Sequence, residues 1–163
     1  MYKLIKLSTE WREDAYISSQ GIAENENEFK NTAYGLTKTE FLEWLRVQEA
    51  WSREQMLPAG YVGQTIYWFE HEGVIVGYGK IRHQLNDSSR ECGGNIGYAI
   101  DNRNRGKGFG AIFLAMLIEK AKEKPVEEIL LTVEKYNPAS KKVIEKCGGK
   151  MIKENSERWF FTF

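Results

Sequence analysis

Apolar positions alternate in some stretches of the chain and recur three or four residues apart in others. The alternating or continuous β-branched and aromatic runs predict strands over 2–8, 65–70, 74–83, 94–100, 128–134, 150–154 and 158–163. The helical spacing predicts helices over 10–19, 38–52, 108–124 and 137–147. The polar segments 21–31 and 86–91 are expected to be loops. The order β-α-α-β-β-β-α-β-α-β-β is typical of an α/β (α+β) fold, with a mixed sheet and helices on its faces.

Local sequence signals indicate where the helices begin and end. Pro125 is expected to stop the third helix, because proline cannot continue the helical hydrogen-bond ladder. Gly148 and Gly149 are expected to end the fourth helix. The residues expected to cap the first, second and fourth helices are Ser8 or Thr9, Thr37 in the capping-box sequence Thr37-Lys38-Thr39-Glu40, and Asn137.

The composition fits a single domain over residues 1–163. Lys and Arg balance Asp and Glu at 23 each, which argues against a dedicated nucleic-acid binder. No apolar run approaches the roughly 20 residues that span a bilayer, and the first residues lack the apolar block of a signal peptide. We therefore expect no membrane partner and a cytoplasmic location. Cys92 and Cys147 are expected to be free thiols, and two histidines, His71 and His83, give no basis for a metal site.

Residues 101–110 combine basic side chains with alternating glycines between a predicted strand and a predicted helix. The basic residues are Arg103, Arg105 and Lys107, and the glycines are Gly106, Gly108 and Gly110. Free N–H groups and the helix dipole favour an anion at such a place, and glycine lets phosphate oxygens approach the backbone. A surface turn with solvated charges is the alternative. The spacing matches neither the nucleoside triphosphate motif GxxxxGK[ST] nor the dinucleotide motif GxGxxG, so the segment predicts a different pyrophosphate or a similar anion.

The segment Arg103-x-x-Gly106-x-Gly108, followed by Phe109-Gly110 and an apolar helix, resembles the coenzyme A motif of the GNAT N-acetyltransferase superfamily. A second segment agrees, because Asn137-Pro138-Ala139-Ser140 followed by Val143-Ile144-Glu145-Lys146-Cys147-Gly148 resembles another motif of these proteins. More narrowly, Gly93–Tyr98 and Arg82-His83-x-Leu85 resemble an uncharacterised bacterial branch. The resemblance implies the GNAT fold, which is a mostly antiparallel sheet of six to seven strands with about four helices, splayed beside its fourth strand.

The resemblance also implies a donor and its binding residues. The donor is acetyl-CoA, used as a co-substrate without a metal, and it inserts where the sheet splays. Backbone N–H groups near 98–100 are expected to polarise the acetyl carbonyl, and the turn 105–110 to fix the pyrophosphate. Asn137 is expected both to cap its helix and to contact the distal coenzyme arm. The cofactor-binding residues implied are Tyr98, Ala99, Ile100, Arg103, Arg105, Gly106, Lys107, Gly108, Phe109, Gly110, Asn137 and Ser140.

The acid and base of the reaction do not follow from the resemblance. The position at which many superfamily members place a tyrosine acid is Ile144, and Gly94 and Asn95 occupy the position of the usual glutamate. His83 is the remaining base candidate, since its ordinary pKa suits proton removal at neutral pH, and Glu134 is a second. A purely structural role is the alternative for His83.

These features together predict transfer of an acetyl group from acetyl-CoA to a primary amine of a small-molecule or peptide acceptor. The acceptor is expected to enter between the 21–36 loop, the second helix and the 83–94 loop. The alternative is a catalytically degenerate, coenzyme A-binding sensor or interaction module, which the residues at 95 and 144 favour. The protein is expected to be a monomer or a homodimer.

Overall fold

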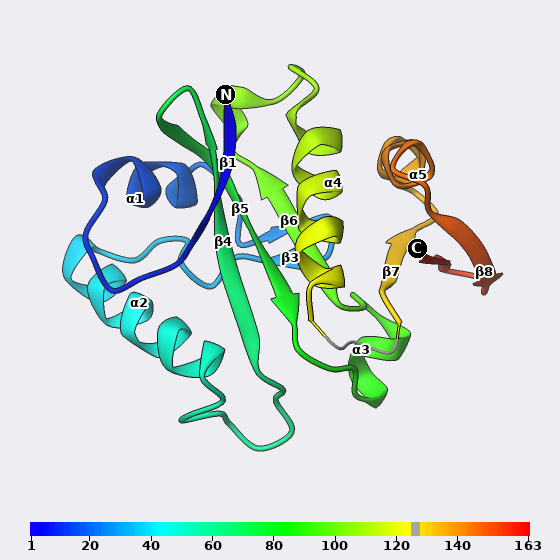
Figure 1. Ribbon diagram of the computed structural model, residues 1–163, viewed down its shortest axis with the longest axis horizontal. Coiled ribbons are helices and arrows are strands. Elements are labelled where there is room, and N and C mark those ends of the chain that lie inside the picture. Colours follow the sequence, from blue (N-terminus) through cyan, green and yellow to red (C-terminus); the bar gives the residue numbers. More distant parts are fainter. Residues whose placement is uncertain (125–127) are drawn as a thin grey trace.

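The computed structural model describes residues 1–124 and 128–163 (Figure 1). The long strands are β1 (Tyr2–Lys6), β4 (Gln64–His71), β5 (Val74–Arg82), β6 (Ile96–Ile100), β7 (Leu130–Glu134), β8 (Lys150–Glu154) and β9 (Arg158–Thr162). The helices are α1 (Glu13–Gln20), α2 (Lys38–Ser52), α3 (Asp87–Glu91), α4 (Phe109–Lys122) and α5 (Pro138–Lys146). Two short strands, β2 (Asn25–Glu26) and β3 (Phe29–Lys30), form a hairpin of their own.

The long strands form two antiparallel sheets that open away from each other. The first sheet has the order β1-β4-β5-β6 and the second the order β7-β9-β8. Asn95, just before β6, joins the sheets at one end, because its N–H donates to Leu130 O at 2.8 Å. Beyond this point β6 and β7 diverge, as the resemblance to the GNAT fold implied.

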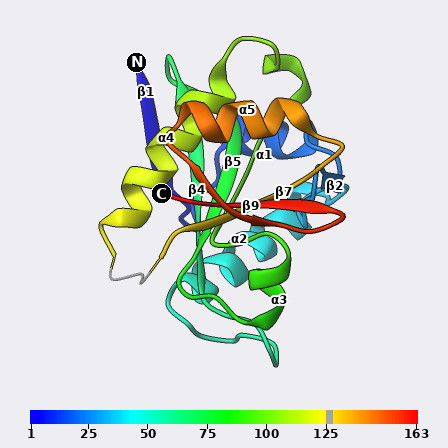
Figure 2. The ribbon, with the colours of Figure 1, turned by 90° about the vertical axis from the view of Figure 1, so that its right-hand side faces the viewer.

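Helices cover the two faces of the first sheet separately. Figure 1 shows α1 and α2 on one side of β4 and β5, and α4 on the other. On the α4 side, Phe113, Leu114 and Leu117 are fully buried against β4, β5 and the second sheet. On the other side, Phe41 and Leu45 of α2 pack with Trp68 of β4. Figure 2 shows α5 lying over β7 and β9 of the second sheet.

The start of the first helix differs from the prediction. The helix begins at Glu13 rather than residue 10, and its N-cap, Arg12, makes no side-chain cap hydrogen bond, so the expected capping by Ser8 or Thr9 is wrong. Tertiary contacts fix this start instead. The Arg12 guanidinium donates to Glu70 Oε2 at 2.9 Å, and the Asp14 carboxylate accepts a bond from Ile75 N at 3.0 Å.

Both segments expected to be loops contain short regular elements. Residues 21–31 include the β2–β3 hairpin, whose turn places Asn27 and Glu28 at φ values of 47° and 70°. Residues 86–91 include α3, which Asn86 and Ser89 stabilise through a reciprocal capping box. The third predicted helix ends at Lys122, two residues early, and the expected stop at Pro125 lies outside the described residues.

Two predicted caps are confirmed. Thr37 Oγ1 accepts a bond from Glu40 N at 3.2 Å, and Glu40 Oε1 accepts one from Thr37 N at 2.9 Å, so both halves of the capping box form. Asn137 Oδ1 accepts a bond from Ser140 N at 3.3 Å at the start of α5. Gly148 follows that helix in the left-handed region, with a φ of 92°.

Candidate active site

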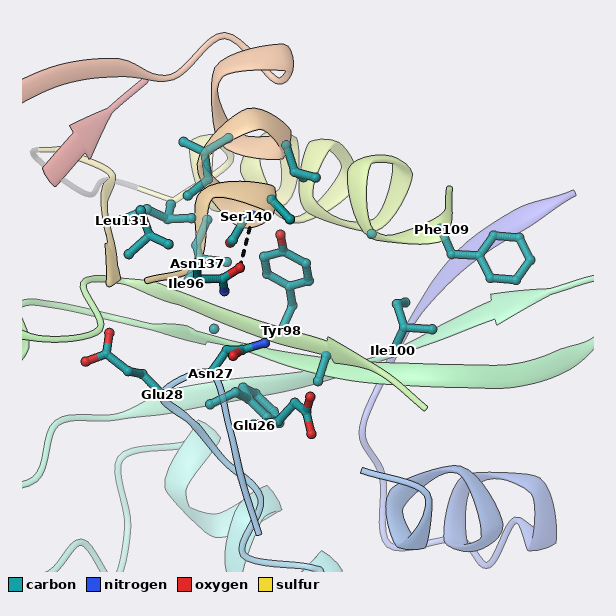
Figure 3. A pocket seen from close by; sticks show the side chains of 18 of the residues that line it. Glu26, Asn27, Glu28, Ile96, Tyr98, Ile100, Phe109, Leu131, Asn137 and Ser140 are labelled. Atoms are coloured by element: carbon teal, nitrogen blue, oxygen red, sulfur yellow. Dashed lines mark hydrogen bonds between the residues drawn. The ribbon is translucent and has the colours of Figure 1, made fainter. Parts of the chain in front are cut away.

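A cavity of about 390 Å³ occupies the opening between the two sheets. Its walls come from β5, β6, β7, the turn before α4, α5 and the β2–β3 hairpin. Figure 3 shows hairpin residues Glu26 and Glu28 on one side of β6, and Tyr98, Asn137 and Ser140 on the other. The cavity therefore has two sides, separated by the edge of the first sheet.

The exposed edge of β6 presents backbone groups to this cavity. Hydrogen bonds at the two ends of the β5–β6 ladder run from Asp101 N to Val76 O (3.0 Å) and from Arg82 N to Asn95 O (2.7 Å). Because antiparallel pairs alternate between bonded and non-bonded, Gly97 and Ala99 share this phase and bond to β5. Ile96, Tyr98 and Ile100 have the opposite phase and turn their N–H and C=O groups toward the opening. Of the predicted 98–100 segment, the amides of Tyr98 and Ile100 are thus free to meet a ligand.

The turn before α4 exposes the N–H groups of the first helical turn. Gly108 is the N-cap residue at φ 79°, and no side chain of the described residues caps this helix start. Gly106 also has a positive φ, 75°. A Cβ added at either glycine would meet nothing within 4 Å, so space is open above this backbone. Gly106, Gly108, Phe109 and Gly110 all line the cavity. This arrangement suits an anion at the helix N-terminus.

Arg105 is the basic residue of the turn that reaches the cavity. Its Nε donates to Ile100 O at 3.1 Å, and its Nη1 lies 3.1 Å from Glu26 Oε1 of the hairpin. The motif spacing R-x-x-G-x-G occurs twice in the turn. It is met by Arg103, Gly106 and Gly108, and again two residues later by Arg105, Gly108 and Gly110. The structure places the second set of residues against the cavity.

The other two predicted basic residues point elsewhere. Arg103 lies 3.7 Å from Asp101 through its Nε, and Lys107 donates to Asn104 Oδ1 at 3.3 Å. Both side chains fall outside the set of described residues that line the cavity.

The α5 wall carries the two residues predicted from the second motif. Asn137 and Ser140 both line the cavity, and the hydroxyl of Tyr98 lies beside Ser140 (Figure 3). Burial raises the pKa of Tyr98 to about 12, so its hydroxyl keeps its proton at neutral pH. Ile144, at the position of the family's tyrosine, is 1% exposed and gives the wall an apolar surface.

Glu134 lies against Glu28 of the hairpin turn, with Arg158 of β9 beside both. Arg158 Nε donates to Glu28 Oε1 at 2.8 Å, and Arg158 Nη2 lies 3.7 Å from Glu134 Oε1. Glu134 Oε2 is buried and has no hydrogen-bond partner among the described residues. Burial, together with the contact to Glu28, raises the pKa of Glu134 to about 7. Glu28 lines the cavity directly and Glu134 stands behind it.

The structure does not bring His83 to this site. Its Nε2 is 2.8 Å from Thr65 Oγ1, and its Nδ1 is 3.2 Å from Glu54 Oε1, beyond the end of β5. His83 falls outside the cavity lining of the described residues, and its neighbours are those of a structural histidine.

Two basic residues of the cavity were missed in the sequence. Lys80 and Arg82 alternate along β5 and both line the hairpin side of the cavity. In the sequence they fit an ordinary strand with solvated charges, and only the hairpin folded over them shows that they are enclosed.

No helix in the described part of the chain is both long and apolar enough to cross a membrane. Within residues 1–124 and 128–163, no group of three or more His, Cys, Asp or Glu side chains is arranged to hold a metal ion.

Comparison with known proteins agrees with this architecture. The model of the acetyltransferase (GNAT) family matches residues 23–149, so the chain belongs to this family. No curated protein matches the sequence.

Solved structures of the same fold are similar over the whole chain. The N-acetyltransferase PseH of Campylobacter jejuni, in complex with acetyl coenzyme A, is 15% identical with a TM-score of 0.62, covering 100% of this chain and 98% of that one. A GNAT acetyltransferase of Streptococcus pneumoniae is 17% identical with a TM-score of 0.62, covering 100% and 99%. The spermidine/spermine N-acetyltransferase SpeG of Vibrio cholerae is 14% identical with a TM-score of 0.62, covering 99% and 95%.

Proposed function

We propose that this protein transfers an acetyl group from acetyl-CoA to a primary amine by direct attack. The observation that carries the proposal is the edge of β6, whose Tyr98 and Ile100 amides face an opening that ends at the uncapped start of α4. A ligand with an amide-containing arm and a pyrophosphate matches these N–H donors, which follow one another along the β6 edge to the start of α4. The family membership supports the same donor.

The residues of the opening fit coenzyme A in chemical type. The N–H groups after Gly108 and the guanidinium of Arg105 suit the pyrophosphate. The β6 edge suits the amides of the pantetheine arm, because an extended chain can pair with an unpaired strand edge. Asn137 and Ser140 line the wall against which the more distant part of the coenzyme would rest.

The thioester is already activated, so the protein has to orient the amine and stabilise charge. The amine nitrogen bonds to the carbonyl carbon, the carbon–sulfur bond breaks, the nitrogen loses a proton and the thiolate gains one. The N–H groups of the β6 edge that face the opening, Tyr98 among them, would polarise the carbonyl oxygen. Glu134, acting through Glu28 at the cavity wall, would accept the amine proton, because its raised pKa matches neutral pH.

A thiol-release assay with acetyl-CoA and a panel of primary amines tests the function. Release above the blank rate with at least one amine, accompanied by an acetylated product of the expected mass, would support it. Tight acetyl-CoA binding with release at the blank rate for every amine would contradict it. That result would favour the coenzyme-binding sensor, for which Ile144 in place of a tyrosine is the supporting observation.

A further inference from the structure

Lys80 and Arg82 lie on one face of β5, under the β2–β3 hairpin. Lys80 Nζ donates to Lys30 O at 3.3 Å and lies 5.1 Å from the centre of the Phe29 ring. Arg82 Nη1 donates to Gly94 O at 2.8 Å. Both side chains are only partly exposed, and both line the cavity.

The nearby carboxylates are engaged with other arginines. Glu26 pairs with Arg105 at 3.1 Å, and Glu28 accepts bonds from Arg158. Within the described residues, no carboxylate oxygen lies within 4.0 Å of Lys80 or Arg82. The hairpin therefore covers two cationic side chains whose protein partners are neutral carbonyl oxygens.

Two partly buried cations without an anion are a costly arrangement, since each loses part of its water and repels the other. Burial, with the neighbouring charges of Arg82 and Lys30, lowers the pKa of Lys80 to about 7. An anionic ligand between the two side chains would compensate both effects.

This cationic pair lies close to where the acetyl group would sit. Lys80 is opposite Gly97 in the β5–β6 ladder, and the amides on either side of Gly97 face the opening. Gly97 has no side chain of its own, and the Phe29 ring packs over it, because a Cβ added there would come within 3.2 Å of that ring. An anion held by Lys80 and Arg82 would thus stand beside the reacting carbonyl.

The pair is separate from the phosphate-binding turn. Three strand residues from Gly97 to Ile100 span about 10 Å, and the turn at 106–110 begins beyond them. In addition, Lys80 lies on the hairpin side of β6, whereas Tyr98 and α5 lie on the other side (Figure 3). The anion at the pair therefore belongs to the second substrate.

We propose that the acceptor is an amine that also carries a carboxylate, as an amino acid does, with the carboxylate held by Lys80 and Arg82. This inference rests on the proposed acetyl transfer and names its substrate class. Acceptors whose amine stands a short distance from a carboxylate fit this site, and amines without an acidic group do not use it.

The test compares amino acids with their own carboxamides in the thiol-release assay, at equal concentrations of unprotonated amine. At least one amino acid should be acetylated with a kcat/KM about tenfold or more above its carboxamide. Equal kcat/KM values for both members of every active pair would overturn the inference while leaving acetyl transfer intact. Release at the blank rate with every amine would instead overturn both proposals.

Variants of Lys80 and Arg82 then test whether the preference for amino acids over carboxamides depends on these two side chains. Lys80→Met and Arg82→Met should each remove most of the preference by raising the KM of the amino acid, while the carboxamide and acetyl-CoA keep their KM values. Lys80→Arg should retain the preference. Arg46→Met is the matched control, because Arg46 is exposed on α2 and, among the described residues, pairs only with Glu43. A thermal shift with acetyl-CoA checks that each variant is folded, and an unchanged preference in the folded Met variants would contradict the assignment.

Discussion

Asn95 and Leu130 hold the two sheets together through a pair of hydrogen bonds. Asn95 N donates to Leu130 O, and Leu130 N donates to the side-chain Oδ1 of Asn95, both at 2.8 Å. The side chain of Asn95 is 1% exposed and replaces the backbone partner that a continuous sheet would supply. The amide therefore ends the pairing between the sheets and lets β6 and β7 separate beyond it. This role explains an asparagine at a position where the family resemblance suggested a catalytic glutamate.

Replacing Asn95 by leucine should destabilise the protein and weaken acetyl-CoA binding. The buried N–H of Leu130 would lose its acceptor, at a cost of about 1–3 kcal/mol in the free energy of unfolding. Urea denaturation measures this change. Asn155→Leu is the control, because Asn155 accepts backbone bonds at an exposed turn where water can replace it. Equal losses in both variants would show that Asn95 has no special joining role.

Replacing Gly108 by glutamate should abolish acetyl-CoA binding while the protein still folds. The new carboxylate would occupy the start of α4, where the pyrophosphate is expected, and repel it. The positive φ adds a backbone cost of about 1–2 kcal/mol. Isothermal titration with acetyl-CoA measures the loss.

Gly73→Glu separates the two effects of the Gly108 change. Gly73 has a φ of 81° and nothing within 4 Å of an added Cβ, much as Gly108 does, but it lies in the β4–β5 turn. It should lose similar stability and keep acetyl-CoA binding. If Gly108→Glu binds acetyl-CoA as well as Gly73→Glu does, the pyrophosphate lies elsewhere.

Arg105 and Arg103 should differ in their effect on the coenzyme, although the sequence suggested both. Arg105→Gln should weaken acetyl-CoA binding by about threefold to tenfold, since it removes a charge-assisted contact at the cavity. Arg103→Gln should change the affinity by less than about twofold, because that side chain is 57% exposed beside Asp101. If titrations at the same ionic strength show a larger loss of acetyl-CoA affinity for Arg103→Gln than for Arg105→Gln, the motif that begins at Arg103 is the functional one.

The pH dependence of kcat/KM should reveal Glu134. A raised carboxyl pKa means that Glu134 is protonated below about pH 7 and becomes a base above it. Since the acceptor amine must also lose a proton, log kcat/KM for a carboxamide acceptor, which does not use Lys80, should rise with a slope of about two below pH 7 and about one above it. Glu134→Gln should lower kcat about 10²-fold or more and leave a single slope of about one.

Glu157→Gln is the control for Glu134. Glu157 pairs with the same Arg158 at 3.1 Å but is exposed, so its removal should leave the slope change in place. A Glu134→Gln profile that still bends near pH 7 would assign the proton to another group.

Much of the fold could be predicted because its signals are local. The capping box at Thr37 and the cap at Asn137 each depend on residues three apart, so the sequence contains the whole interaction. The start of α1 could not be found in this way, because Arg12 is held by Glu70, which is distant in the sequence. The hairpin and α3 were missed because elements of two to five residues leave no periodic pattern.

The candidate site could likewise be predicted from the sequence only in part. The glycine turn could be located from the sequence, since backbone conformation and charge are encoded there. Which arginine faces the cavity depends on the path of the turn, and the enclosure of Lys80 depends on the hairpin folding over β5. The separation of His83 from the cavity likewise follows from its contacts with Thr65 and Glu54 rather than from its position after a strand.

We expect the opening between β6 and β7 to hold acetyl-CoA, and isothermal titration of acetyl-CoA into the wild-type protein measures this binding. Binding should saturate at one acetyl-CoA per chain, coenzyme A should compete with it, and Gly108→Glu should remove it. No heat of binding and no rise in thermal stability at millimolar acetyl-CoA, in a protein that is folded, would contradict this expectation.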